Sequence, residues 1–228
     1  MIRTLPTSLN AFSGLRKAVI GAAAAITMMG AAEAATVNIS GTVAPPTGLN
    51  NFAAQLTAAL GSAVLLESAS LTTGVGVPVR LTFTAVGAES GYKNSFTAVG
   101  AGTLNETGPN FGFPNINLLT TVGIGSVTGV FSGLLDGLLS FTNNLGPSNV
   151  LIGVPGSAAF GVFVSGGAGK HSVFFLAFDD GAKKPDDNHD DFLIRVNVSQ
   201  VPLPAGGLLL IGGLGALTAM RRRKATAV

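Results

Sequence analysis

Residues Val77–Val86 read VPVRLTFTAV, and every second position from 79 to 85 is apolar. The positions between them, 80, 82 and 84, carry Arg or Thr. A period of two residues is that of a β-strand with one buried face. After the turn at residues 87–91, Tyr92–Val99 has a similar pattern, so the two segments together predict a β-hairpin.

Strands are also predicted on both sides of this segment. Thr36–Val43 (TVNISGTV) alternates, and Ala158–Val164 (AAFGVFV) and Ser172–Phe178 (SVFFLAF) are short apolar runs typical of core strands. Asp191–Gln200 (DFLIRVNVSQ) closes the domain and alternates from residue 192 onward. In this last strand the even positions 192–198 are expected to face inward, and Leu193 is an apolar exception among the outward positions.

One segment has helical spacing. In Asn50–Leu60 (NNFAAQLTAAL), Phe52, Leu56 and Leu60 fall on one face, with Asn50 or Asn51 available as N-cap. Residues 104–117 are rich in Asn, Gly and Pro and predict a surface loop. Residues 118–152 are punctuated by Gly, and their paired leucines at 134–135 and 138–139 fit either a short amphipathic turn or two buried strand ends.

The composition favours a turn-rich β protein. The chain of 228 residues contains 32 Gly and no Cys, and only 11% of its residues are charged. These features and about eight short strands predict a mainly β fold, a single jelly-roll-like β-sandwich at residues 35–200 with one short helix. A signal helix on its N-terminal side and a transmembrane helix on its C-terminal side are expected to flank it.

Residues 1–34 have the plan of a secretory signal peptide. Basic residues at 3, 16 and 17 precede an apolar region at 18–32, and Ala32-Glu33-Ala34 is an A-x-A cleavage site. Cleavage there gives a mature chain that begins at Ala35. The alternative is an uncleaved N-terminal anchor.

Residues 201–228 form a distinct tail. Leu203–Met220 contains no charged residue and, as a helix, would measure about 27 Å, close to the hydrocarbon thickness of a bilayer. A basic cluster follows and is expected to stay cytoplasmic, as the positive-inside rule requires; it consists of Arg221, Arg222, Arg223 and Lys224. The alternative is a buried C-terminal core helix.

The tail VPLPAGGLLLIGGLGALTAMRRRK resembles the VPLPA-CTERM sorting signal, a variant of the bacterial PEP-CTERM class. Its motif residues are Val201, Pro202, Leu203, Pro204 and Ala205. The resemblance implies a Gram-negative bacterium, and export by the secretion translocon across the inner membrane. It also implies a transient inner-membrane anchor, processing by an exosortase-type peptidase, and release to the cell surface or the exterior. It implies nothing about the activity of residues 35–200.

A second resemblance covers part of the central domain. The pieces RLTFTAV, Gly91–Phe96 (GYKNSF), VFFLAF-Asp179-Asp180 and Asp186–Asp191 before FLIRV are similar to exported bacterial β-sandwich domains of unknown function. Members of that family typically close with a D-x-D-aromatic-x-D loop. This chain has Asn188 and His189 where Asp and an aromatic residue are usual, which weakens an implied metal role.

The Asp-rich segment is the candidate site. Asp186, Asn188 and Asp190 have the D-x-[DN]-x-[DN] spacing with which calcium loops begin, and flanking carboxylates can complete an oxygen shell. Those flanking residues are Asp179, Asp180 and Asp191. The alternative is a solvated acidic turn, partly balanced by Lys183 and Lys184, with His189 as a solvated neighbour.

Charge and motifs narrow the function. Residues 35–202 carry six basic and ten acidic side chains, a net charge of −4, which argues against a nucleic-acid partner. The chain has no G-x-S-x-G or H-E-x-x-H motif and no Cys, so we expect no enzyme. The sequence favours an exported, non-enzymatic protein of the cell envelope or extracellular matrix. The alternative is a calcium-dependent carbohydrate-binding module that takes an extracellular polysaccharide; a hydrolase is the third hypothesis.

Overall fold

The structure is a computed structural model that describes residues 34–44, 52–74, 76–88, 93–106, 125–143, 152–181, 189–202 and 212–217. Of the two units of the chain, Met1–Ala34 and Ala35–Val228, these residues represent almost only the second. The predicted signal peptide before Ala34, the sorting residues Leu203–Ala205 and the basic cluster lie outside the described residues.

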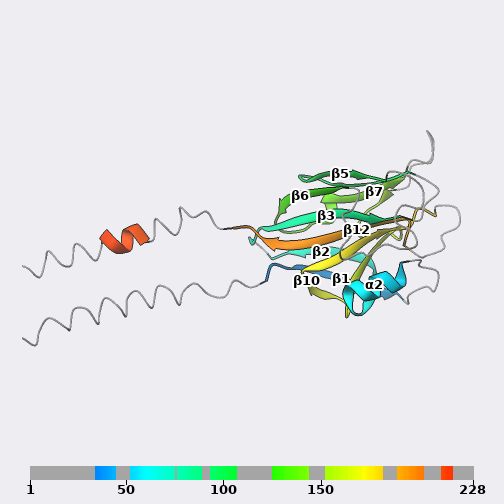
Figure 1. Ribbon diagram of the computed structural model, residues 1–228, viewed down its shortest axis with the longest axis horizontal. Helices are drawn as coiled ribbons and strands as arrows, with labels where there is room; N and C mark the ends of the chain where they lie inside the picture. The colour runs from blue at the N-terminus through cyan, green and yellow to red at the C-terminus, as the bar shows by residue number, and fades with distance from the viewer. Residues whose placement is uncertain are drawn as a thin grey trace, which may run out of the picture. The chain divides into compact units, whose positions relative to one another are not determined.

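Two antiparallel sheets form a sandwich, which confirms the mainly β prediction (Figure 1). An eight-stranded sheet has the order β10-β1-β2-β9-β11-β12-β3-β6, and a four-stranded sheet has the order β5-β4-β7-β8. The elements are β1 (Val37–Ala44), α2 (Ala53–Leu60), β2 (Ala63–Thr73), β3 (Val79–Gly87), β4 (Asn94–Ala98), β5 (Gly102–Asn105), β6 (Ser126–Phe131), η1 (Asp136–Leu138), β7 (Leu139–Asn143), β8 (Ile152–Gly153), β9 (Phe160–Ser165), β10 (Gly169–His171), β11 (Val173–Phe178) and β12 (Phe192–Gln200).

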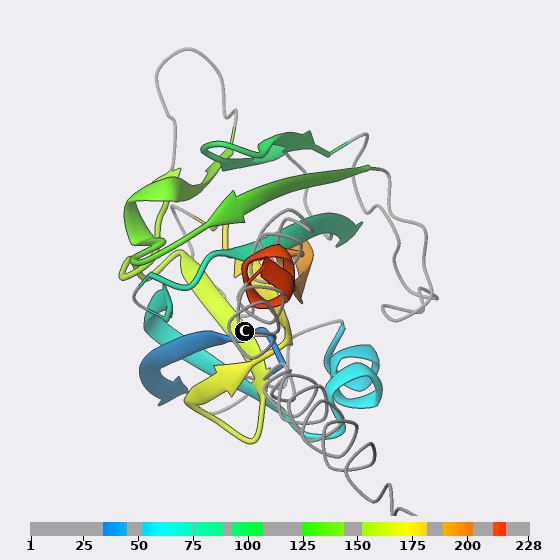
Figure 2. The ribbon, with the colours of Figure 1, turned by 90° about the vertical axis from the view of Figure 1, so that its left-hand side faces the viewer.

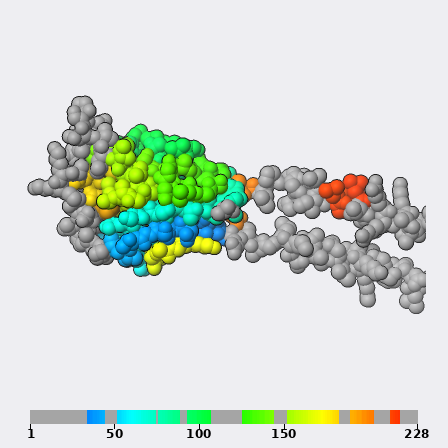
Figure 3. All heavy atoms as spheres, turned by 180° about the vertical axis from the view of Figure 1, so that it is seen from behind, coloured from blue at the N-terminus to red at the C-terminus, as the bar shows by residue number. Residues whose placement is uncertain are grey.

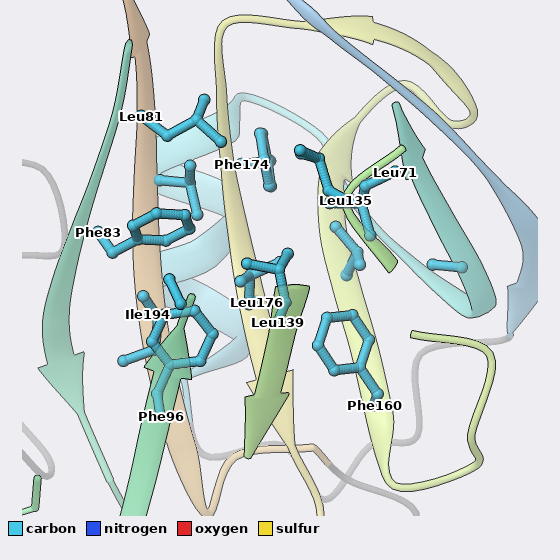
Figure 4. Packing of buried hydrophobic residues seen from close by; sticks show 14 of the residues in the cluster. Leu71, Leu81, Phe83, Phe96, Leu135, Leu139, Phe160, Phe174, Leu176 and Ile194 are labelled. Carbon is cyan, nitrogen blue, oxygen red and sulfur yellow. The ribbon is translucent and has the colours of Figure 1, made fainter. Parts of the chain in front are cut away.

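The main core lies between the two sheets and is rich in phenylalanine (Figure 4). Phe83 of the eight-stranded sheet lies 5.2 Å, between ring centroids, from Phe96 of the four-stranded sheet. Phe141 continues this contact at 5.0 Å from Phe96 and stacks on Phe178 at 5.2 Å. The predicted inward positions of β3 and β12 all pack in or against this core.

A second apolar cluster covers the outer face of the eight-stranded sheet. Phe52 and Leu56 of the α2 region are fully buried there against Val86, Phe175 and Leu193, among others. Figure 2 shows α2 on the side away from the four-stranded sheet. This helix explains why Leu193, on the outward face of β12, is apolar. The expected Asn cap is wrong: Phe52 is the N-cap and makes no side-chain capping bond.

The predicted hairpin of residues 77–99 is wrong. β3 pairs with β12 and β6, whereas β4 pairs with β5 and β7, so the chain crosses from one sheet to the other between them. The same alternation arises either way, because both strands present their apolar positions to a common interior. Leu104 and Asn105, expected in a loop, belong to β5.

The sequence gives no sign of β2, and its two adjacent leucines show why. Leu65 is buried beneath α2, whereas Leu66 points into the main core. At these two residues the strand is covered on both faces and does not alternate. Buried positions alternate with less buried ones only after Ser68, whose φ of 49° interrupts the regular strand. In the undecided middle region, η1 is a short turn, and β7 begins at the buried Leu139. The segment therefore contains the predicted turn and one of the two predicted strand ends, whereas Leu134 is exposed.

The first and last strands meet at one end of the sandwich. Val37 pairs with His171, and the next residue, Ser172, accepts a hydrogen bond from the Val198 amide at 2.8 Å. The start of β1 and the end of β12 therefore lie close together, as Figure 1 also shows. Figure 3 shows β1 on the surface between β2 and β10.

Residues 212–217 are helical, and Leu214 and Leu217 are exposed. Within the described part of the chain, no helix is long and apolar enough to span a membrane.

Candidate functional site

A buried polar cluster lies where strand ends of both sheets meet, and we call it the acidic end. Its aspartates follow β11 (Asp179, Asp180) or precede β12 (Asp190, Asp191), so they belong to the eight-stranded sheet. Three further members belong to the four-stranded sheet, at the start of β4, directly after β5 and at the end of β7; they are Asn94, Glu106 and Asn143. All but the half-buried Asp191 are buried.

Two asparagines connect the sheets across this cluster. The Asn94 Nδ2 donates to Asp180 Oδ2 at 3.0 Å and to the Asp191 carbonyl at 3.2 Å. The Asn143 Nδ2 donates to the Asp180 carbonyl at 3.3 Å. Asn94 and Asn143 are themselves opposite each other in the β4–β7 register. The acidic end is therefore a polar link between two sheets that otherwise meet through apolar side chains.

Glu106 is tied to Asn94 by two reciprocal bonds. Its Oε2 accepts from the Asn94 amide at 3.1 Å, and its own amide donates to the Asn94 carbonyl at 2.9 Å. Burial raises the pKa of the Glu106 carboxyl to about 7, and the charge of Asp180 adds to this rise against the opposing Asn94 hydrogen bond. Glu106 Oε1 and Asn94 Oδ1 are buried and have no hydrogen-bond partner among the described residues.

Asp191 receives a short hydrogen bond from the Asp180 amide, 2.6 Å to its Oδ2. Burial nevertheless raises the pKa of the Asp191 carboxyl to about 9, with further contributions from the carboxylates of Asp180, Asp179 and Asp190. The antiparallel pairing of β11 with β12 causes this crowding, because it brings the end of one strand beside the start of the other. Ionising all four aspartates together is therefore unfavourable.

The expectation that His189 is solvated is wrong. His189 is completely buried, and its backbone is in the left-handed region with φ of 51°. Its Nε2 lies 3.0 Å from the Ala158 carbonyl, which can only accept, so Nε2 carries the proton. An ideal Cβ at Gly161 would lie 2.7 Å from the ring, so the glycine in the β9 sequence marks a close approach.

The structure brings four of the six predicted ligands together: Asp179, Asp180, Asp190 and Asp191. Asp186 and Asn188 lie outside the described residues, so the predicted calcium loop stays a prediction. Among the residues that the structure does describe, no three His, Cys, Asp or Glu side chains have the arrangement of a preformed metal site.

Asn94 and Glu106 were not predicted as site residues, although each is a polar residue in line with a buried apolar position of its strand. Asn94 shares the buried face of β4 with Phe96 and Ala98. A polar side chain in line with core positions needs a buried partner, and here that partner is Asp180. Glu106 stands in the same relation to the buried Leu104.

No family model matches the chain, and no curated protein or solved structure matches it either. The chemistry of the acidic end therefore has to be inferred from its own residues.

In the absence of divalent cations, we expect the protein to be less stable at pH 9 than at pH 5. A carboxyl whose pKa is raised by folding stabilises the fold fully below its unfolded pKa, and this stability is lost as the pH rises through the folded pKa. For Glu106 that window runs from about 4.5 to about 7, and for Asp191 the loss continues to about 9. Glu106 alone accounts for a loss of up to about 3 kcal/mol in the free energy of unfolding over its window.

Urea denaturation in chelator at pH 5, 7 and 9 measures this dependence. Glu106→Gln should remove the part between pH 5 and 7, whereas Glu67→Gln, at a half-buried carboxylate on β2, should leave it unchanged. Stability that is constant or rises over this range contradicts the prediction.

Proposed function

We propose that the chain is an exported, non-enzymatic protein, sorted through its VPLPA-type tail and destined for the cell envelope or extracellular matrix. In this proposal a jelly-roll-like sandwich at residues 35–200 is exported across the inner membrane. It is held there by the tail until an exosortase-type peptidase processes it. The observation that carries the proposal is that the strands of the sandwich begin just after the predicted cleavage site and end just before the predicted sorting motif. β1 begins at Val37, shortly after the cleavage site at Ala34, and β12 ends at Gln200, directly before Val201 and Pro202.

The geometry of the sandwich supports a tethered arrangement. The tail leaves from the Gln200 end of β12, whereas the acidic end adjoins Phe192 at the other end of the same strand. Nine residues of strand separate these ends by about 26 Å. A tether at Gln200 thus leaves the acidic end free to face away from the membrane. The Asp180 carboxylate there is hydrogen-bonded to Asn94 of the other sheet, which suits an ion-binding or structural role.

A calcium-dependent carbohydrate-binding module is the second candidate, and one surface favours it. The outward positions of the four-stranded sheet carry uncharged hydroxyl groups, with Ser95 Oγ 2.6 Å from Thr142 Oγ1 and Thr97 Oγ1 3.0 Å from Thr103 Oγ1. Such a face offers many donors and acceptors to a neutral polysaccharide. Binding to a glycan array that disappears in chelator would support this candidate; no binding in millimolar calcium would exclude it for the glycans tested.

Neutral residues in place of Arg221, Arg222, Arg223 and Lys224 should weaken retention at the inner membrane and impair processing. These charges are expected to hold the end of the apolar segment in the cytoplasm. Membrane fractionation and intact-mass spectrometry in a host with an exosortase measure both effects. The unaltered chain should yield a species that begins at Ala35 and lacks the basic cluster.

Lys170→Gln, a neutral replacement at an exposed residue of β10, is the matched control and should process normally. A full-length species that retains Met1 and Arg223 in such a host would contradict the proposal. Normal sorting of the neutral-tail variant would contradict the role of the cations.

A further inference from the structure

Among the residues that the structure describes, Oδ1 of Asn94 and Oε1 of Glu106 are buried oxygen atoms at the acidic end with no hydrogen-bond partner. The two residues are only 2% and 6% exposed. An unsatisfied buried acceptor is unfavourable, so folded proteins normally satisfy such atoms with a hydrogen bond, a water molecule or an ion. Both atoms have lone pairs to offer a cation, and their residues lie opposite each other, one position beyond the Ser95–Asn105 pair of the β4–β5 ladder.

The Asn94 side chain is directed into the cluster of carboxylates, and the Glu106 side chain is bonded to the Asn94 backbone. The carboxamide of Asn94 is held by its nitrogen, which bonds Asp180 Oδ2 and the Asp191 carbonyl, so Oδ1 of the same group lies beside these oxygens. Glu106 is held by Oε2, which accepts from the Asn94 amide, and its second oxygen remains available. The unpartnered atoms thus belong to groups whose other atoms are already fixed in place.

The donor set indicates the class of ligand. Carboxylate, amide and carbonyl oxygens are the ligands of hard cations, and calcium accepts 6–8 of them in irregular geometry at 2.3–2.6 Å. Magnesium demands a near-ideal octahedron at shorter distances. The oxygens here come from four separate segments, the starts of β4 and β12 and the ends of β5 and β11, which suits the less demanding ion.

Electrostatics also favours a cation. Five carboxyl groups lie at this end of the sandwich, and those of Asp179, Asp180, Asp190 and Glu106 are buried. A divalent ion close to these groups would offset the repulsion between the carboxylates, because each of them would be attracted to the ion.

We propose that the acidic end binds one calcium ion between the two sheets, with Asn94 and Glu106 as donors from the four-stranded sheet and Asp180 and Asp191 as donors from the eight-stranded sheet. Because no three acidic side chains of the described residues are grouped as in a preformed metal site, binding is expected to draw the strand ends of the two sheets together. Water completes the coordination shell. Asp186 and Asn188 are not part of this proposal, and it does not depend on export.

Calorimetric titration of the full-length chain in detergent, stripped with chelator and studied at pH 7.5, tests the proposal. CaCl2 should bind with a stoichiometry of one, and MgCl2 at least tenfold more weakly. A hundredfold excess of calcium over Kd corresponds to about 2.7 kcal/mol of stabilisation, which for a domain of this size raises Tm by about 5–10 °C. Equal Tm values in chelator and in millimolar calcium, with no heat of binding, would overturn the proposal.

Three variants locate the ion. Glu106→Gln, nearly isosteric, should raise the calcium Kd at least tenfold. Asn94→Asp should melt lower than the parent in chelator, because it places a carboxylate against Asp180, and should recover most of that loss in calcium. Glu67→Gln, the matched control on β2, should bind like the parent. The site is overturned if Glu106→Gln binds calcium with the Kd of the parent and calcium does not recover the Tm of Asn94→Asp. The ion would then bind elsewhere.

Discussion

Phe141→Ala should lower the free energy of unfolding by about 3–5 kcal/mol. Phe141 is completely buried on β7, and its ring contacts residues of both sheets. It lies 5.0 Å from Phe96 within its own sheet and 5.2 Å from Phe178, stacked at 7°, across the interior. Phe160 and Phe192 also pack against it. Truncation leaves a cavity that four rigid rings cannot close, which places the cost at the upper part of the usual range.

Urea denaturation followed by circular dichroism measures this loss, and Tm should fall by about 10 °C or more. Phe141→Leu is the matched control, because it keeps most of the apolar volume and should cost less than half as much. A loss below about 1 kcal/mol for Phe141→Ala would show that the aromatic contacts between the sheets are not essential to stability.

Asp136→Ala should cost about 2–4 kcal/mol, the second largest effect. Asp136 lies in η1, on the connection between β6 of the eight-stranded sheet and β7 of the four-stranded sheet. Its Oδ2 accepts from Ser70 Oγ at 2.7 Å, and its Oδ1 accepts from the Leu71 amide at 2.8 Å. Removal takes away two charge-assisted hydrogen bonds and leaves the amide of a fully buried residue without this acceptor.

Ser70→Ala, which removes only the hydroxyl bond, is the matched control and should cost about 1 kcal/mol. Asp136→Asn keeps one carbonyl oxygen and should fall between the two. Equal stability of Asp136→Ala and Ser70→Ala would mean that the Leu71 amide finds another acceptor, and that the connection does not hold β2.

Strands could be predicted from the sequence by alternation, as in β3, or by a short apolar run where both faces are buried, as in β9 and β11. β3 has its apolar positions in the core and exposes Arg80, so its period of two is visible in the sequence. β2 could not be found, because its first part has adjacent buried leucines and its alternation begins only after Ser68, where the backbone is irregular. The false hairpin has a different cause: periodicity specifies which side of a strand is buried, but not which sheet the strand joins.

Only those residues of the candidate site that lie close together in the sequence were predicted. Asp179, Asp180, Asp190 and Asp191 lie close in the sequence, so their proximity follows from one connection between neighbouring strands. Asn94 is 86 residues from Asp180, and their contact depends on how the two sheets are stacked, which no local pattern encodes. Glu106 joins through Asn94 and was hidden for the same reason.

The placement of β12 has a mechanical consequence. The strand that continues into the tail is an interior strand, hydrogen-bonded to β11 on one side and to β3 on the other along most of its length. A force that pulls Gln200 outward along the strand axis loads both ladders in shear, so their hydrogen bonds resist together instead of opening one after another. An edge strand such as β6 or β10 in the same position would share that load with only one neighbour. A domain held by one terminus against flow or a bound surface is therefore attached through one of its most resistant strands.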